Sequence, residues 1–170
     1  MAIMVHATPG TGTRGVLSIG SWTVRCALGR GGVRTDKREG DGATPRAALA
    51  LRRVFYRADK LVRPETALPI QPIRPDDGWC DDPAHPRYNT LIRLPFRAGH
   101  ERMWREDGLY DVVVELGWND DPPIKHHGSA IFLHVARDDY MPTEGCIALK
   151  KSDVLRLVRR LEPWMSIAIV

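Results

Sequence analysis

The chain has 170 residues, of which 43% are hydrophobic and 27% are charged. This length and composition predict a single globular domain, residues 1–170, with an apolar core of its own. The 13 prolines and 15 glycines indicate many turns, which favours a mainly β architecture over a helical bundle.

The net charge is +4, and the basic residues are spread along the chain. Such a charge attracts an anionic polymer, either nucleic acid or cell-wall material. The sequence has no zinc-finger, helix-turn-helix or aromatic-rich RNA-binding motif, so nucleic acid is not an expected partner. No stretch approaches the roughly 18 apolar residues of a membrane span, so none is predicted.

Residues 1–10 lack the positively charged start and the long apolar segment of a signal peptide. Three interpretations stay open at this stage. An export signal has been removed, export follows another route, or the protein is cytoplasmic.

Residues 15–20 and 22–28 alternate apolar and polar side chains, and Gly20-Ser21 between them predicts a β-hairpin turn. The glycine-rich stretch 29–45 follows. It contains no Gly-Lys-Ser/Thr sequence, so a nucleotide-binding loop is not predicted. Residues 47–56 are rich in Ala, Leu and Arg, which favours a helix, but their alternation also permits a strand.

Residues 57–90 contain many prolines and predict one long loop, which Trp79 and Tyr88 keep ordered. The loop also carries four acidic residues and a histidine of the types that bind metal ions: Asp76, Asp77, Asp81, Asp82 and His85. Their spacing fits neither an EF-hand nor a zinc motif, so no metal site is expected.

In the C-terminal half, residues 109–116 form the clearest predicted strand, because they are β-branched and apolar. A helix is predicted from residue 150, with Ser152 as its N-cap and Pro163 beyond its end. Residues 166–170 predict a final buried strand.

The stretch 128–149 contains the candidate catalytic residues. It predicts two apolar strands joined by a polar loop, the first ending on His134 and the second beginning on Cys146. Neighbouring strands would bring the two side chains together, and a thiolate beside an imidazole is a nucleophile. A buried structural cysteine and a satisfied core histidine are the alternative. His126 and His127 are rival bases, but they enter the strand at its opposite end.

Cys26 and Cys80 are the other two cysteines, and an odd count leaves at least one thiol free. The two could pair in an oxidising compartment. We expect instead that both stay reduced and unreactive.

Two segments carry a family resemblance. The sequence Thr143-Glu-Gly-Cys-Ile147, together with His134, resembles the Ser/Thr-His-Gly-Cys signature of the L,D-transpeptidase catalytic domain, also called YkuD or ErfK. About a hundred residues upstream, Lys37–Pro45 resembles the Gly-Asp-Gly-x-Thr-Pro turn of the same family. Three features depart from the family pattern: Glu144 replaces a His, Ala148 replaces an Arg, and His134 precedes Cys146 by only 12 residues (146 − 134). These departures indicate a divergent proteobacterial branch with a shorter loop and a more open site.

The resemblance implies a mainly β, single-domain, β-sandwich-like catalytic fold with one C-terminal helix, and it favours a strand over residues 47–56. It implies cross-linking of peptidoglycan stem peptides in the periplasm by a monomer, with no metal or organic cofactor. Cys146 would form the acyl-enzyme, His134 would take the thiol proton or hold it as an ion pair, and amides near Gly145 and Cys146 would bind the oxyanion. The residues expected near the substrate are Thr143, Glu144, Trp79, Tyr88 and Asn89.

The divergent branch is associated with 1–3 links, which join L-Ala to diaminopimelate, and most of the family makes 3–3 links. Two other functions stay open. The site could hydrolyse stem peptides as a thiol peptidase or amidase, or the domain could bind the cell wall without catalysis.

Overall fold

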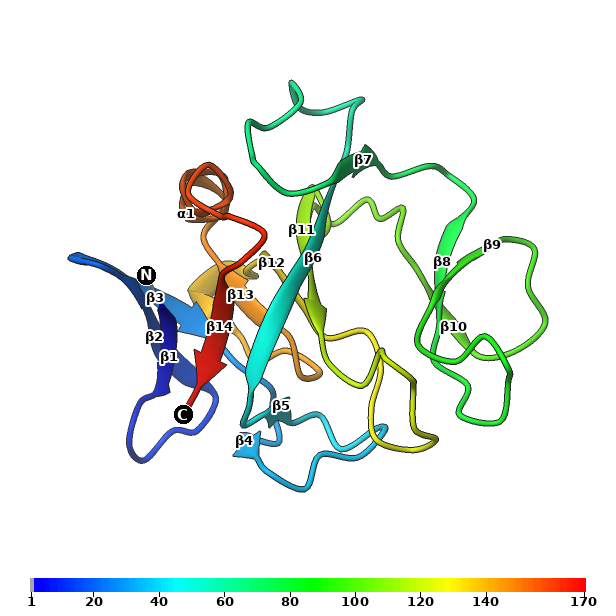
Figure 1. Ribbon diagram of the computed structural model, residues 1–170, viewed down its shortest axis with the longest axis horizontal. Helices are drawn as coiled ribbons and strands as arrows, with labels where there is room; N and C mark the ends of the chain where they lie inside the picture. The colour runs from blue at the N-terminus through cyan, green and yellow to red at the C-terminus, as the bar shows by residue number, and fades with distance from the viewer. Residues whose placement is uncertain (1) are drawn as a thin grey trace.

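The computed structural model describes residues 2–170 as one mainly β domain (Figure 1). A curved sheet forms its body, one helix covers it, and a small three-stranded sheet stands apart on one side. The elements in chain order are β1 (Ile3–Ala7), β2 (Arg14–Ile19), β3 (Trp22–Ala27), β4 (Val33–Arg34), β5 (Thr44–Pro45), β6 (Ala48–Tyr56), β7 (Ile70–Pro72), β8 (Asp77–Cys80), β9 (Leu91–Arg93), β10 (His100–Arg102), β11 (Val112–Gly117), β12 (Phe132–Val135), the 3₁₀ turn η1 (Asp138–Tyr140), β13 (Ile147–Leu149), α1 (Lys151–Val158) and β14 (Ser166–Ile169).

The main sheet has the strand order β11-β12-β13-β3-β2-β1-β14-β6-β7. Strand β11 also pairs with β6, so the sheet closes on itself. The long strand β6 makes this closure possible, because Ala50 pairs with Ser166 of β14 on one edge and with Gly117 of β11 on the other. The two smaller sheets are β10-β8-β9 and β4-β5.

Alternating apolar side chains of the main sheet form the core, and α1 adds Val154, Leu157 and Val158 to it. The helix packs against β11 and β12. Burial of these side chains therefore helps to fix the strand that carries His134.

Several predicted elements are confirmed. The predicted hairpin of β2 and β3 turns at Gly20-Ser21, where Gly20 has a φ of 59° that suits glycine. The stretch 47–56 is the strand β6, and the chain ends on β14. The composition of β6 also favours a helix, but the segment pairs with β11 on one edge and with β14 on the other, and this pairing makes it a strand.

The N-cap prediction was wrong. The Lys150 carbonyl accepts the amides of Asp153 and Val154 at 2.8 and 3.0 Å, which makes Lys150 the N-cap and places Ser152 inside the first turn. The prediction of one long loop over 57–90 was also wrong in part. That stretch contains β7, which pairs with β6, and β8, which pairs with β9 and β10.

Candidate active site

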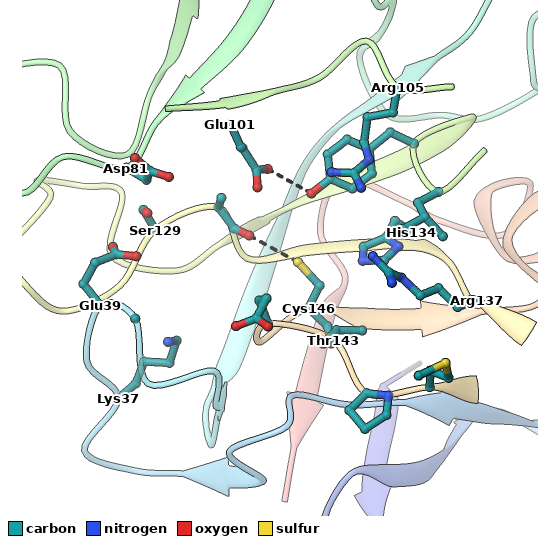
Figure 2. Close-up of a pocket in the computed structure, with 17 residues that line it drawn as sticks. Lys37, Glu39, Asp81, Glu101, Arg105, Ser129, His134, Arg137, Thr143 and Cys146 are labelled. Atoms are coloured by element: carbon teal, nitrogen blue, oxygen red, sulfur yellow. Dashed lines mark hydrogen bonds between the residues drawn. The ribbon is translucent and has the colours of Figure 1, made fainter. Parts of the chain in front are cut away.

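A cavity of about 380 Å³ opens where three parts of the fold meet. The main sheet contributes His134 from β12 and Cys146, which immediately precedes β13. The small sheet contributes Asp81, after β8, and Glu101, in β10. The loop between β4 and β5 contributes Lys37 and Glu39. Figure 2 shows these side chains around one space.

Strands β12 and β13 run parallel, with Leu133 opposite Ile147. This register places Cys146, the residue before Ile147, level with Phe132 at the start of β12. Cys146 is only 8% exposed, and its sulfur has two backbone partners. The thiol donates to the Ala130 carbonyl at 3.2 Å, and the sulfur accepts the Phe132 amide at 3.4 Å. The segment that leads into β12 therefore fixes the position of the sulfur.

His134 lines the same cavity as Cys146, on the side that carries Arg105 and Arg137 (Figure 2). Among residues 2–170, no hydrogen bond joins the His134 ring to the Cys146 sulfur. Its Nδ1 is 2.8 Å from the Val135 carbonyl oxygen. A carbonyl only accepts, so Nδ1 carries the proton and Nε2 keeps a lone pair for use as a base. The ring also packs edge-on against Tyr110, with 5.3 Å between the ring centroids.

The thiol and the imidazole are both neutral in the free protein. Burial raises the pKa of Cys146 to about 12, and repulsion by Glu101 adds to this effect. Burial lowers the pKa of His134 to about 4, with further lowering by the nearby guanidinium groups. Of the two predicted forms of the pair, proton acceptance by His134 during attack fits this state, and a resting ion pair does not.

Thr143 organises the turn that precedes the nucleophile. Its hydroxyl donates to the Cys146 carbonyl at 2.6 Å and accepts the Gly145 amide at 3.1 Å. Its backbone bonds to Leu28 and Arg30, just after the end of β3. Hydrogen bonds of Thr143 thus stabilise the turn internally and also bind it to the segment that follows β3.

Gly145 brings the two family segments into contact. Its φ is 134°, and a Cβ atom there would lie 2.7 Å from the Ala43 carbonyl oxygen. Ala43 is held by Asp41, whose carboxylate accepts the Ala43 amide at 2.8 Å and Lys37 Nζ at 2.6 Å. The Gly-Asp-Gly stretch therefore forms the surface on which the cysteine turn rests.

Glu144 points to the rim of the cavity. Its carboxylate pairs with Arg30 Nε at 2.9 Å, and its side chain is 78% exposed. Among the described residues, it makes no hydrogen bond to His134. An exposed pair of this kind contributes little to stability.

Trp79, Tyr88 and Asn89 are buried and do not line the cavity. Asn89 Oδ1 accepts the Ala130 amide and Trp79 Nε1, each at 3.0 Å. The Tyr88 hydroxyl accepts the Gly128 amide at 3.0 Å. These side chains lie beneath the residues that line the cavity. They bind the backbone segment before β12, and the Ala130 carbonyl of that segment accepts the Cys146 thiol.

Sequence reasoning missed much of the cavity wall. Lys37 and Glu39 belong to a segment that the sequence singles out, although neither was predicted to face the site. Glu101, Arg105 and Arg137 gave no signal, and Asp81 was interpreted only as a possible metal ligand. Within residues 2–170, no group of three His, Cys, Asp or Glu side chains is arranged to hold a metal ion. His126 and His127 are exposed and are not part of the wall.

The other two cysteines are buried free thiols, as expected. Burial raises the pKa of Cys26 to about 12 and also raises that of Cys80. Neither lines the cavity with His134.

The chain is a mainly β domain in which His134, in β12, and Cys146, just before the adjacent parallel strand β13, line one cavity. The L,D-transpeptidase catalytic domain family, YkuD, matches residues 3–169. The chain belongs to this family, whose domain acts on peptidoglycan. Comparison with curated proteins and with solved structures gave no significant match. No helix among residues 2–170 is long and apolar enough to cross a membrane.

The high pKa of Cys146 predicts how its alkylation depends on pH. Because the thiolate is the reactive form, labelling by iodoacetamide should be slow at neutral pH and rise about tenfold per pH unit up to roughly pH 9. Peptide mapping by mass spectrometry separates Cys146 from Cys26 and Cys80. A rate that is already constant between roughly pH 5 and pH 9 would indicate a resting ion pair and contradict the neutral state.

The contact between Gly145 and Ala43 predicts that Gly145→Ala lowers the free energy of unfolding by about 1–3 kcal/mol, because it adds a backbone clash to an unfavourable φ. Gly10→Ala is the matched control: Gly10 has a φ of 86°, and a Cβ there meets nothing within 4 Å. Urea denaturation measures both variants. Equal losses in the two would show that the Ala43 contact does not matter.

Proposed function

We propose that this protein is a peptidoglycan L,D-transpeptidase that works through an acyl-enzyme on Cys146. The observation that carries the proposal is the shared cavity of a neutral buried thiol and an imidazole with a free Nε2, in a chain of this family. Periplasmic action follows from the substrate class.

In the first half of the reaction, Cys146 Sγ attacks a carbonyl carbon of the donor stem peptide. His134 Nε2 takes the thiol proton as the carbon–sulfur bond forms. The carbon–nitrogen bond of the donor then breaks, and His134 returns the proton to the leaving amine. The product is a thioester on Cys146.

In the second half, an amine of diaminopimelate on an acceptor stem attacks the thioester carbon. His134 removes a proton from the attacking nitrogen, the carbon–sulfur bond breaks, and the thiolate recovers that proton. A new amide joins the two stems. Water in place of the amine would give hydrolysis, so exclusion of water from the cavity separates transferase from hydrolase.

The oxyanion needs a backbone donor close to the sulfur. The Gly145 amide already donates to Thr143 Oγ1 in the free protein. We therefore assign this role to the amide of Cys146, which makes no hydrogen bond to other described residues. The role of Gly145 is then to let the turn approach Ala43 so that this amide faces the cavity.

For the bond specificity we propose 1–3 links. The support is the short connection between His134 and Cys146, in which the η1 turn is followed directly by Met141 and Pro142 on the cavity wall. Glu144 contributes less, because it faces Arg30 at the rim.

The nucleophile assignment predicts that Cys146→Ala abolishes cross-linking, with a loss of at least about 10³-fold as for other removed nucleophiles. Cys26→Ala and Cys80→Ala are matched controls and should keep most activity, because those thiols lie outside the cavity. Chromatography and mass spectrometry of muropeptides give the products. Cross-linked dimers from the Cys146→Ala protein would refute the mechanism, and shortened stems alone from the wild type would make it a hydrolase.

The specificity assignment predicts that Glu144→His, which restores the common family residue, leaves 1–3 links as the product. Only the rim pair with Arg30 is lost, and the connection keeps its length. Glu144→Gln serves as the control for loss of charge. Tandem mass spectrometry of the dimers distinguishes the links, and a switch to 3–3 links in Glu144→His would place specificity in this side chain.

A further inference from the structure

One end of the cavity gathers three carboxylates from three separate elements. Glu39 comes from the loop between β4 and β5, Asp81 follows β8, and Glu101 lies in β10. Figure 2 shows all three on the side of Cys146 away from Arg137. The cavity is therefore acidic at one end and basic at the other.

No cation among residues 2–170 neutralises the acidic end through an ion pair. Lys37 is paired with Asp41 at 2.6 Å, and Arg105 with Asp107 at 2.5 Å. Within the same residues, the side-chain donors to Glu39 and Glu101 are the hydroxyls of two tyrosines, Tyr88 and Tyr110.

Burial, with a smaller contribution from mutual repulsion, raises the pKa values of Glu101 and Asp81. Burial is the main cause that raises the pKa of Glu101 to about 7, and the charges of Asp81 and Glu39 act in the same direction, against the opposing effects of the Tyr110 hydroxyl and Arg105. Burial and the charge of Glu39 likewise raise the pKa of Asp81. A positive group bound among these carboxylates would remove the repulsion.

A fourth residue points to a ligand independently of charge. Ser129 is 9% exposed, and its hydroxyl has no hydrogen-bond partner among the described residues. Figure 2 shows it between Asp81 and Glu39 on the cavity wall. A buried hydroxyl without a partner is costly, and a bound donor would satisfy it.

The arrangement suits an organic cation better than a metal ion. Within residues 2–170, the three carboxylates are not close enough together to form a metal-binding group. A primary ammonium carries three N–H donors on a flexible carbon chain, so it can reach spread acceptors. It also matches the chemistry of a stem peptide, in which diaminopimelate carries a free amine.

We propose that Glu39, Asp81, Glu101 and Ser129 form a subsite for the primary ammonium group of a diamino acid residue in the stem peptide. This inference rests on the proposed function for the identity of the substrate. Cys146 lies between this acidic subsite and the basic end, so a zwitterionic residue would span the nucleophile. The ammonium belongs either to the donor or to the acceptor stem.

Binding tests the subsite without catalysis. The probes are the tripeptide L-Ala-γ-D-Glu-diaminopimelate with its amine free and the same peptide with that amine acetylated. Calorimetry on the Cys146→Ala protein should show about tenfold weaker binding of the acetylated peptide, as expected for loss of a charge-assisted contact. Asp81→Asn or Glu39→Gln in this background should weaken binding of the free peptide and remove the difference between the two.

Glu65→Gln is the matched control, since this carboxylate is 87% exposed in its side chain and lies between β6 and β7, outside the cavity. It should bind both peptides as the parent does. Circular dichroism checks that each variant is folded. Equal binding of the two peptides by the parent protein, or an unchanged difference in folded Asp81→Asn and Glu39→Gln, would overturn the subsite.

Reactions of the wild type identify the stem that carries the ammonium. If acetylation of the donor alone stops acyl-enzyme formation, the subsite holds the donor. If the acetylated donor forms the acyl-enzyme as fast as the free donor, the subsite holds the acceptor. Acetylation of the acceptor itself does not enter the test, because it removes the attacking amine. Absence of any acyl-enzyme, with the binding difference intact, would refute the proposed function and leave the subsite standing.

Discussion

The hydrogen bond from the Cys146 thiol to the Ala130 carbonyl is the contact on which the site depends. Ala130 has a φ of 53°, a left-handed conformation that costs a non-glycine residue about 1 kcal/mol. Asn89 offsets this cost by accepting the Ala130 amide, and Asn89 is itself held by Trp79. The irregular backbone also explains why β12 begins only at Phe132, although apolar residues begin earlier.

The same contact explains how a buried thiol can be poised without being ionised. In the free protein its proton is directed at a backbone carbonyl, and His134 directs its own proton at Val135. The Nε2 lone pair is thus available but unused until a substrate carbonyl approaches. A neutral pair avoids the desolvation cost of burying two charges. In a resting ion pair, the attraction between the two charges would have to offset that cost.

The sequence predicted the parts of the site that depend on local pattern. His134 and Cys146 stand at the ends of apolar runs, and the Gly-Asp-Gly segment has a recognisable turn composition, so residue order alone is enough to find both. Ser152 was misplaced as a cap because a helix can begin at any residue whose carbonyl accepts the first amides, here Lys150.

The acidic end was not predictable in the same way. Glu39, Asp81 and Glu101 come from three elements that meet only through the placement of the small sheet beside the main one. Trp79 and Asn89 drew attention as candidate substrate contacts, yet they lie behind the wall. Residue type alone does not distinguish a side chain that contacts the substrate from a buried one that positions the backbone of the cavity wall.

The central claim is that the Cys146 sulfur carries the acyl group, and a trapped intermediate tests it most directly. Wild-type protein mixed with a disaccharide-peptide donor, without acceptor, would be quenched in acid and digested for mass spectrometry. The account predicts the mass of one donor acyl group on the peptide containing Cys146, removed by hydroxylamine as a thioester is. Donor turnover with no adduct on that peptide, or an adduct on Cys26 or Cys80, would contradict it.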